Sequence, residues 1–191
     1  MPATVRPPAA DAAPVDPDPV LVDPDPAPAD PAPAPVDGPL RPAILADIAA
    51  GIAAARPLWG AVVRHDPDER QPVRLLATER YEVWVIGWAP GQGVEPHDHG
   101  DAAGAFVVTS GTLTEVVPRP GGAVERQLEP GQVRHVPVGA VHDVVNRGTE
   151  PATSIHVYSP PLTAMTYYDL DTLAPIATVP QLPEQPLLAA R

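Results

Sequence analysis

The spacing of apolar side chains changes once along the chain, from a helical period to a strand period. Between residues 40 and 55 the large aliphatic residues recur at three- and four-residue intervals, at Ile44, Leu45, Ile48 and Ile52. This spacing predicts a helix with one apolar face. The proline at position 57 disfavours helical backbone at the residue before it, so we expect the helix to end there.

Beyond Trp59 apolar and polar residues alternate in short segments, which are separated by turns that contain glycine or proline. The segments expected to be strands are residues 81–88, 104–109, 113–117, 123–128, 133–136, 141–145 and 153–158. Short strands at such regular spacing are typical of a β-sandwich or barrel. We therefore predict a mainly β protein, an antiparallel β-barrel with a small N-terminal helical cap.

The first 39 residues differ in composition from the rest of the chain. They hold 13 of the 30 prolines and seven aspartates against a single arginine, so they carry six of the twelve net negative charges. Their repeated Asp-Pro and Ala-Pro pairs prevent helices and central strands. We predict a disordered acidic leader over residues 1–39, one compact domain over 40–175 and a C-terminal tail over 176–191.

Composition and charge exclude several classes of function. The chain contains no cysteine, so it has no disulfide, no cysteine-ligated metal and no thiol nucleophile of its own. A net charge of −12 repels phosphate backbones, which argues against nucleic-acid binding. There is no secretory-signal pattern and no apolar run of about 18 residues, so we expect no membrane span and a cytoplasmic location.

Three of the six histidines stand where they could hold a metal ion. His97 and His99 are two residues apart in an extended stretch, so their rings project from one face, and His142 lies in a separate expected strand. An isolated His-X-His pair is often a surface coincidence. Three imidazoles converging inside a barrel, however, would form a metal site with three open positions. Imidazole suits iron, zinc, copper and nickel alike, so these ligands alone do not select the metal.

Glycines at fixed offsets surround these histidines. One such stretch spans residues 91–111 around the first two, and a second spans residues 131–146 around the third. Both stretches resemble the paired motifs of the cupin superfamily. Gly104 stands where most cupins carry a metal-binding glutamate. Three neutral imidazoles would leave a divalent ion its full charge, and such a centre attracts anions and favours deprotonation of a bound thiol.

Within that superfamily the chain resembles the cysteine dioxygenases, or thiol dioxygenases more broadly. The likeness covers roughly residues 42–170 and is carried by five segments: Trp88–Gly91, His97–Gly100, Gly104–Val108, His142–Asn146 and Ser154–Pro161. The resemblance implies a cupin jelly roll in which His97, His99 and His142 bind Fe²⁺. It also implies that a small thiol amino acid and O₂ meet at the metal, where L-cysteine becomes cysteine sulfinic acid.

The last of these segments has a polar face that can also be interpreted without the family. In a strand Ser154, His156 and Tyr158 share one side, and each needs a hydrogen-bond partner when buried. We predict a relay in which Ser154 fixes His156 and His156 holds the Tyr158 hydroxyl. The resemblance implies that these are catalytic residues, that the tyrosine hydroxyl lies over the iron, and that the Ser159–Pro160 bond is cis.

One feature of the animal enzymes cannot be present. They carry a cysteine that is crosslinked to the tyrosine, and Gly104 occupies the equivalent position here. Since the chain has no cysteine, a Cys–Tyr thioether cofactor is impossible. Bacterial members resemble this sequence in having glycine at that position, so we expect the tyrosine to act without a crosslink.

Substrate selection in the family depends on an arginine that binds the substrate carboxylate, or on a glutamine in relatives that prefer 3-mercaptopropionate. Arg74 is the best match, because a guanidinium can pair with a carboxylate through two parallel hydrogen bonds, while Gln71 three residues away is the alternative. We expect Tyr167 and Tyr168 to serve in packing. We expect the other arginines of this region to be solvated: Arg64, Arg70 and Arg80.

These observations favour an Fe²⁺-dependent cysteine dioxygenase, expected to be a monomer. One alternative keeps the chemistry and replaces the substrate with 3-mercaptopropionate or another small thiol. A second is a non-enzymatic cupin that senses or stores metal. A third, a zinc cupin acting as a sugar isomerase or hydrolase, is disfavoured by Gly104 and by the Ser-His-Tyr strand.

Overall fold

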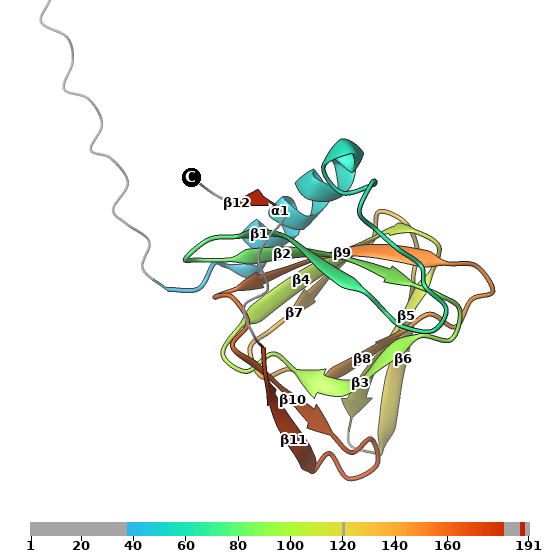
Figure 1. Cartoon of the computed structure of the whole chain (residues 1–191). Helices are drawn as coiled ribbons and strands as arrows, with labels where there is room; N and C mark the ends of the chain where they lie inside the picture. The colour runs from blue at the N-terminus through green and yellow to red at the C-terminus, as the bar shows by residue number, and fades with distance from the viewer. Residues whose placement is uncertain (1–37, 120, 182–187, 190–191) are drawn as a thin grey trace, which may run out of the picture. The chain divides into compact units, whose positions relative to one another are not determined.

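The computed structural model describes residues 38–119, 121–181 and 188–189. Except for its last two residues, the expected disordered leader lies outside these described residues, as does much of the expected C-terminal tail. The described chain forms one α-helix and two six-stranded sheets, which face each other in Figure 1. This arrangement confirms the predicted antiparallel β-barrel with an N-terminal helical cap.

The first sheet has the strand order β12-β1-β2-β9-β4-β7 and the second has the order β11-β10-β3-β8-β5-β6. Neighbouring strands are antiparallel except β1 and β12, which run parallel. The strands of the first sheet are β12 (Leu188–Ala189), β1 (Pro72–Ala77), β2 (Glu82–Trp88), β9 (Ala152–Ser159), β4 (Ala103–Ser110) and β7 (Val133–Val136). Those of the second are β11 (Pro175–Pro180), β10 (Ala164–Tyr168), β3 (Gly93–Asp98), β8 (His142–Val145), β5 (Leu113–Arg119) and β6 (Gly122–Leu128).

The helix α1 (Pro42–Ala54) lies on the outer face of the first sheet, against β4, β7 and β9, and a 3₁₀ turn over Arg56–Leu58 follows it (Figure 1). Leu45 and Ala49 are completely buried. Ile44, which we expected on the same apolar face, is 38% exposed. The correction is small, because the buried stripe of the helix is centred on the i, i+4 pair formed by Leu45 and Ala49.

Alternation along the strands gives the first sheet two different faces. Its outward-facing aliphatic residues pack with α1 in one core cluster that includes Val83, Val85, Ile155 and Val157. Its inward-facing residues pack against the second sheet in another cluster that includes Trp88, Phe106, Val108, Leu113 and Val144. The inward faces also carry most of the buried polar residues, so the chemistry of the protein lies between the sheets.

The second sheet is larger than the sequence indicated. The strands β10 and β11 form an antiparallel pair, and β11 extends the sheet past residue 175, where we expected a tail to begin. Every residue of β11 is exposed, so this strand has no buried face and lacks the alternating pattern from which a half-buried strand is predicted.

No helix in the described part of the chain has the length and hydropathy needed to cross a membrane.

Candidate metal centre and cavity

The second sheet brings three histidines together. His97 lies near the end of β3, His99 follows that strand directly, and His142 begins β8. A register shift in β3 between Val94 and His97 allows β3 to place His97 opposite His142. The candidate ligand nitrogens all lie within 4.8 Å of one another, and all three residues are buried. The three histidines predicted to bind metal therefore form one compact cluster.

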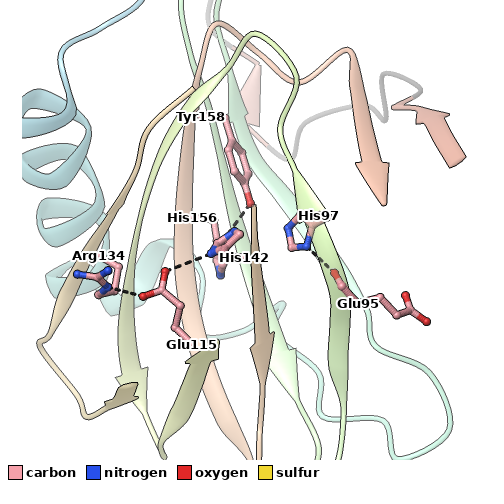
Figure 2. A network of polar contacts seen from close by, with 7 residues as sticks. All are labelled: Glu95, His97, Glu115, Arg134, His142, His156 and Tyr158. Atoms are coloured by element: carbon pink, nitrogen blue, oxygen red, sulfur yellow. Dashed lines mark hydrogen bonds and ion pairs between the residues drawn. The ribbon is translucent and has the colours of Figure 1, made fainter. Parts of the chain in front are cut away.

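Hydrogen bonds determine which ring nitrogens are available to a metal ion. His97 Nδ1 donates to the Glu95 backbone carbonyl at 2.8 Å, and His142 Nδ1 donates to the Glu115 carboxylate at 3.2 Å (Figure 2). Neither acceptor carries a hydrogen, so each Nδ1 is protonated and each Nε2 presents a lone pair. His142 Nε2 and both nitrogens of His99 are buried without a hydrogen-bond partner among the described residues. A metal ion would satisfy His142 Nε2 and one of the two His99 nitrogens, which are otherwise costly to bury, so the residues fit a metal.

Burial keeps the imidazoles of His97 and His99 uncharged. Burial, followed by the nearby ring of His142, lowers the pKa of His97 to about 3. The same two causes lower the pKa of His99 well below its ordinary value. Since both rings are neutral near pH 7, they can donate to a metal ion without first losing a proton.

Glu115 links His142 to a further charged residue. The Glu115 side chain lies on β5 and is 2% exposed, and Arg134 on β7 donates from Nε to its second oxygen at 2.6 Å (Figure 2). Burial alone would raise the pKa of Glu115, but the hydrogen bonds from His142 and Arg134 outweigh burial and lower it. We did not predict either residue. The sequence feature that could have indicated Glu115 is its position two residues after Leu113, which places an acid on the inward side of an apolar strand.

The strand β9 carries the predicted polar relay. Ser154 Oγ is 2.7 Å from His156 Nε2, and His156 Nδ1 is 3.2 Å from the Tyr158 hydroxyl. Trp88 on β2 extends the relay, because its indole N–H donates to Ser154 Oγ at 2.8 Å. The Ser154 hydroxyl then donates its hydrogen to His156 Nε2. Neutral His156 therefore carries its proton on Nδ1, and this N–H donates to the Tyr158 hydroxyl oxygen. This leaves the Tyr158 hydroxyl hydrogen available to a ligand.

Tyr158 lies between the relay and the histidine cluster. Its ring centroid is 4.7 Å from that of His99, and burial raises the pKa of its hydroxyl, which therefore stays protonated. A Cβ atom at Gly104 would lie 3.2 Å from Tyr158 Cδ1 and 3.6 Å from His99 Nδ1, so glycine leaves room for the tyrosine ring. The Ser159–Pro160 bond is cis, as the resemblance implied.

A cavity of about 370 Å³ opens beside these groups. His97 and His142 line it together with His156 and Tyr158. Tyr167, which we expected to serve in packing alone, lines it too. Its remaining walls are mainly apolar and come from both sheets, with Ile86, Val144, Met165 and Val179 among them.

The cavity is also lined by an arginine, but not by the one that we predicted. Arg74 Nη1 is 3.2 Å from Glu82 Oε2, both side chains are buried, and Arg74 is not among the residues that line the cavity. Arg70, which we expected to be solvated, lines the cavity with its guanidinium 5.0 Å from the centre of the Trp88 ring. Burial lowers the pKa of Arg70 below its very high ordinary value. Glu82 therefore pairs with Arg74, and the guanidinium that lines the cavity is that of Arg70.

Comparison with known proteins identifies the family. The sequence profile described as "Cysteine dioxygenase type I" matches residues 44–171. Among solved structures, the protein TT1209 from Thermus thermophilus has 24% identity over 53% of this chain and 93% of its own, with a TM-score of 0.48. A protein with a double-stranded β-helix domain from Klebsiella pneumoniae has 27% identity over 53% of this chain and 85% of its own, also with a TM-score of 0.48. Because the profile matches well over half of the chain and spans all three histidines, the protein belongs to the cysteine dioxygenase type I family.

Proposed function

We propose that this protein is an Fe²⁺-dependent dioxygenase that oxidises L-cysteine to cysteine sulfinic acid. Both atoms of O₂ are added to sulfur, so RSH becomes RSO₂H and no further oxidant is required. The family and the three-histidine cluster support a metal-dependent cupin thiol dioxygenase. The observation that carries the proposal is a single cavity that combines two of these histidines with a cationic side chain, Arg70, and a hydroxyl donor, Tyr158.

His97, His99 and His142 would hold the iron through their unprotonated nitrogens. The ion would supply open coordination positions for a thiolate and for O₂, which brings the two reactants within bonding distance. All three candidate ligands are imidazoles, and the described residues that line the cavity include Arg70 but no aspartate or glutamate. The site therefore has a positive electrostatic balance that favours an anionic substrate.

Arg70 is the residue that we assign to the substrate carboxylate. Its guanidinium is held against the Trp88 ring, and none of the ion pairs in the described part of the chain involves it. A guanidinium offers two parallel N–H groups that match the two oxygens of a carboxylate. Arg70 would therefore fix the end of the substrate that is remote from the sulfur.

Tyr158 is the residue that we assign to hydrogen bonding at the reacting end of the substrate. Its hydroxyl accepts from His156 Nδ1 and keeps its own proton, because burial raises its pKa. Phe106 stacks on the His156 ring at 4.9 Å with an interplanar angle of 8°, which restrains the orientation of that ring. The relay would thus aim one hydroxyl hydrogen at the bound substrate, without a change in protonation.

The same chemistry on 3-mercaptopropionate is a second candidate. This thiol acid lacks the ammonium group of cysteine, and the described cavity lining offers no acidic side chain to pair with such a group. A substrate with a carboxylate and no ammonium group leaves no charge unpaired in the cavity. A binding protein without catalytic activity is the remaining outcome that an experiment must separate.

The test uses the full chain, loaded with Fe²⁺ under anaerobic conditions and then mixed with ¹⁸O₂ and either thiol. We expect oxygen uptake and a sulfinate that carries two ¹⁸O atoms, detected by mass spectrometry. Tyr158→Phe should slow turnover while iron remains bound, whereas Tyr81→Phe, outside the cavity, should not. Iron binding without thiol-dependent oxygen uptake would show a non-enzymatic cupin and refute the proposal.

A further inference from the structure

A buried carboxylate is hydrogen-bonded to one of the candidate metal ligands, His142. Position 104, where most cupins offer a glutamate to the metal, is glycine, and no described acidic residue lines the cavity. Glu115 nevertheless accepts a hydrogen bond from His142 Nδ1 while being 2% exposed. The protein therefore has a buried negative charge next to the candidate metal ligand His142.

The arrangement of strands explains why this carboxylate reaches His142. The strands β5 and β8 are antiparallel neighbours in which Glu115 pairs with Val144, two residues from His142. Residues two apart in a strand share a face, so Glu115 and His142 both project between the sheets. Arg134 comes from the first sheet, where it pairs with Phe106 of β4, and its contact with Glu115 crosses the space between the sheets.

Glu115 and Arg134 have opposite effects on the candidate metal ligand His142. A carboxylate that accepts the Nδ1 hydrogen fixes the ring orientation and increases the electron density on Nε2, which strengthens the ligand. Arg134 withdraws density from the same carboxylate through a short charge-assisted hydrogen bond. Figure 2 shows Arg134, Glu115 and His142 following one another in a single chain of contacts.

We propose that Glu115 and Arg134 are positioning residues that set the reduction potential and affinity of the metal at His142, with opposite signs. Glu115 favours the higher oxidation state of the ion and tighter binding, and Arg134 limits this effect. The inference rests on the metal centre of the proposed function but does not depend on which thiol is oxidised. The competing explanation is a purely structural tie between the two sheets, in which the charges have no effect on the metal.

The test compares Glu115→Gln, which keeps the shape and removes the charge, with Arg134→Gln and Arg134→Lys. For Glu115→Gln we expect affinity for Co²⁺, followed by visible absorption, to fall 10- to 100-fold. We expect its Fe³⁺/Fe²⁺ potential to rise by about 60 mV, which corresponds to a tenfold change in relative affinity for the two ions. Arg134→Gln should lower the potential, and Arg134→Lys should return it toward the wild-type value.

The exposed pair Glu125–Arg147, with 2.7 Å between its charged atoms, provides the matched control. Glu125→Gln and Arg147→Gln should leave both the potential and the Co²⁺ affinity unchanged. Potentials that move in the same direction for Glu115→Gln and Arg134→Gln, or that do not move, would establish the structural tie and overturn the inference. If Glu115→Gln does not fold, the sign of the Arg134→Gln shift and its recovery in Arg134→Lys decide the question.

A second measurement needs no metal. Nitrogen NMR of the metal-free protein should show His142 protonated on Nδ1, and Glu115→Leu should remove this preference. Protonation on Nε2 in the wild-type protein would contradict the inference. The two proposals also fail separately: potential shifts without thiol oxidation refute only the proposed function, and thiol oxidation with unshifted potentials refutes only the role of Glu115 and Arg134.

Discussion

Two arginines that lie four residues apart should respond differently to the same substitution. Arg70→Gln removes a cation from the cavity wall, whereas Arg74→Gln removes one partner of a buried ion pair with Glu82. We expect Arg70→Gln to weaken substrate binding without a large loss of stability. We expect Arg74→Gln to destabilise the fold and to leave the Michaelis constant of the folded fraction near its wild-type value.

The structure indicates the size of each effect. A hydrogen bond between charged groups contributes about 1.5–3 kcal/mol, so the loss of Arg70 should lower kcat/KM by about 10- to 150-fold. The Arg74 and Glu82 side chains are 9% and 1% exposed, and breaking such a buried pair costs about 3–5 kcal/mol. At about 2–4 °C per kcal/mol for a domain of this size, Tm should fall by about 6–20 °C. Glu82 Oε1 also accepts a hydrogen bond from the Leu162 amide at 3.0 Å, so in Arg74→Gln the loop after β9 should become less ordered as well.

The assay combines initial rates of oxygen uptake over a range of thiol concentrations with thermal unfolding followed by circular dichroism. Cysteamine, a thiol without a carboxylate, supplies the internal control, because its oxidation should not depend on Arg70. The opposite pattern would refute the reasoning: an Arg74→Gln variant with a raised KM and an unchanged Tm, beside an Arg70→Gln variant with wild-type kinetics. That result would restore Arg74 as the carboxylate-binding residue.

Three further variants and conditions test other parts of the site. Tyr158→Phe should retain iron, measured by metal analysis, and lose about 1 kcal/mol of stability with its buried hydrogen bond, while turnover falls. Gly104→Ala should displace the Tyr158 ring by a few tenths of an ångström and cost about 1–3 kcal/mol, measured by urea unfolding; an unchanged midpoint would contradict the close approach. In metal-free protein the pKa of His97 is about 3, so its ring stays neutral above that pH in the folded state. In the unfolded chain the same ring takes up a proton below about pH 6.5. Between these two pH values the unfolded state therefore binds more protons than the folded state, so the free energy of unfolding should decrease by about 1.4 kcal/mol for each pH unit of acidification. Urea midpoints that stay constant from pH 7 to 5 would exclude this.

The parts of the site that follow from short-range patterns could be predicted from the sequence. His97 and His99 share a face because they are two residues apart at the end of a strand, and the relay on β9 has the same two-residue period. The choice between Arg70 and Arg74 has no such local basis. Arg70 precedes β1 and Arg74 lies within it, so no strand period relates the two, and the position of Glu82 on the neighbouring strand decides which is engaged.

The Glu115–Arg134 pair was still less accessible to sequence reasoning. Its members belong to different sheets, and their contact depends on how closely those sheets approach. An acid on an otherwise apolar strand indicates that some partner exists, since a buried carboxylate requires one. It does not indicate which residue that partner is, so His142 and Arg134 became evident only from the three-dimensional arrangement.

The position of the apolar core explains how the relay can be both polar and well ordered. All eight residues of β9 are buried, so the strand is packed on both of its faces. Ile155 and Val157 point away from the cavity into the cluster that contains Leu45 of α1, and both are completely buried. Packing on that outer face fixes the backbone of β9, and the backbone in turn fixes the spacing of the inward side chains. Because the site residues take no part in this outer core, their identity can be determined by hydrogen bonding and metal binding, without loss of the contacts that hold the strand.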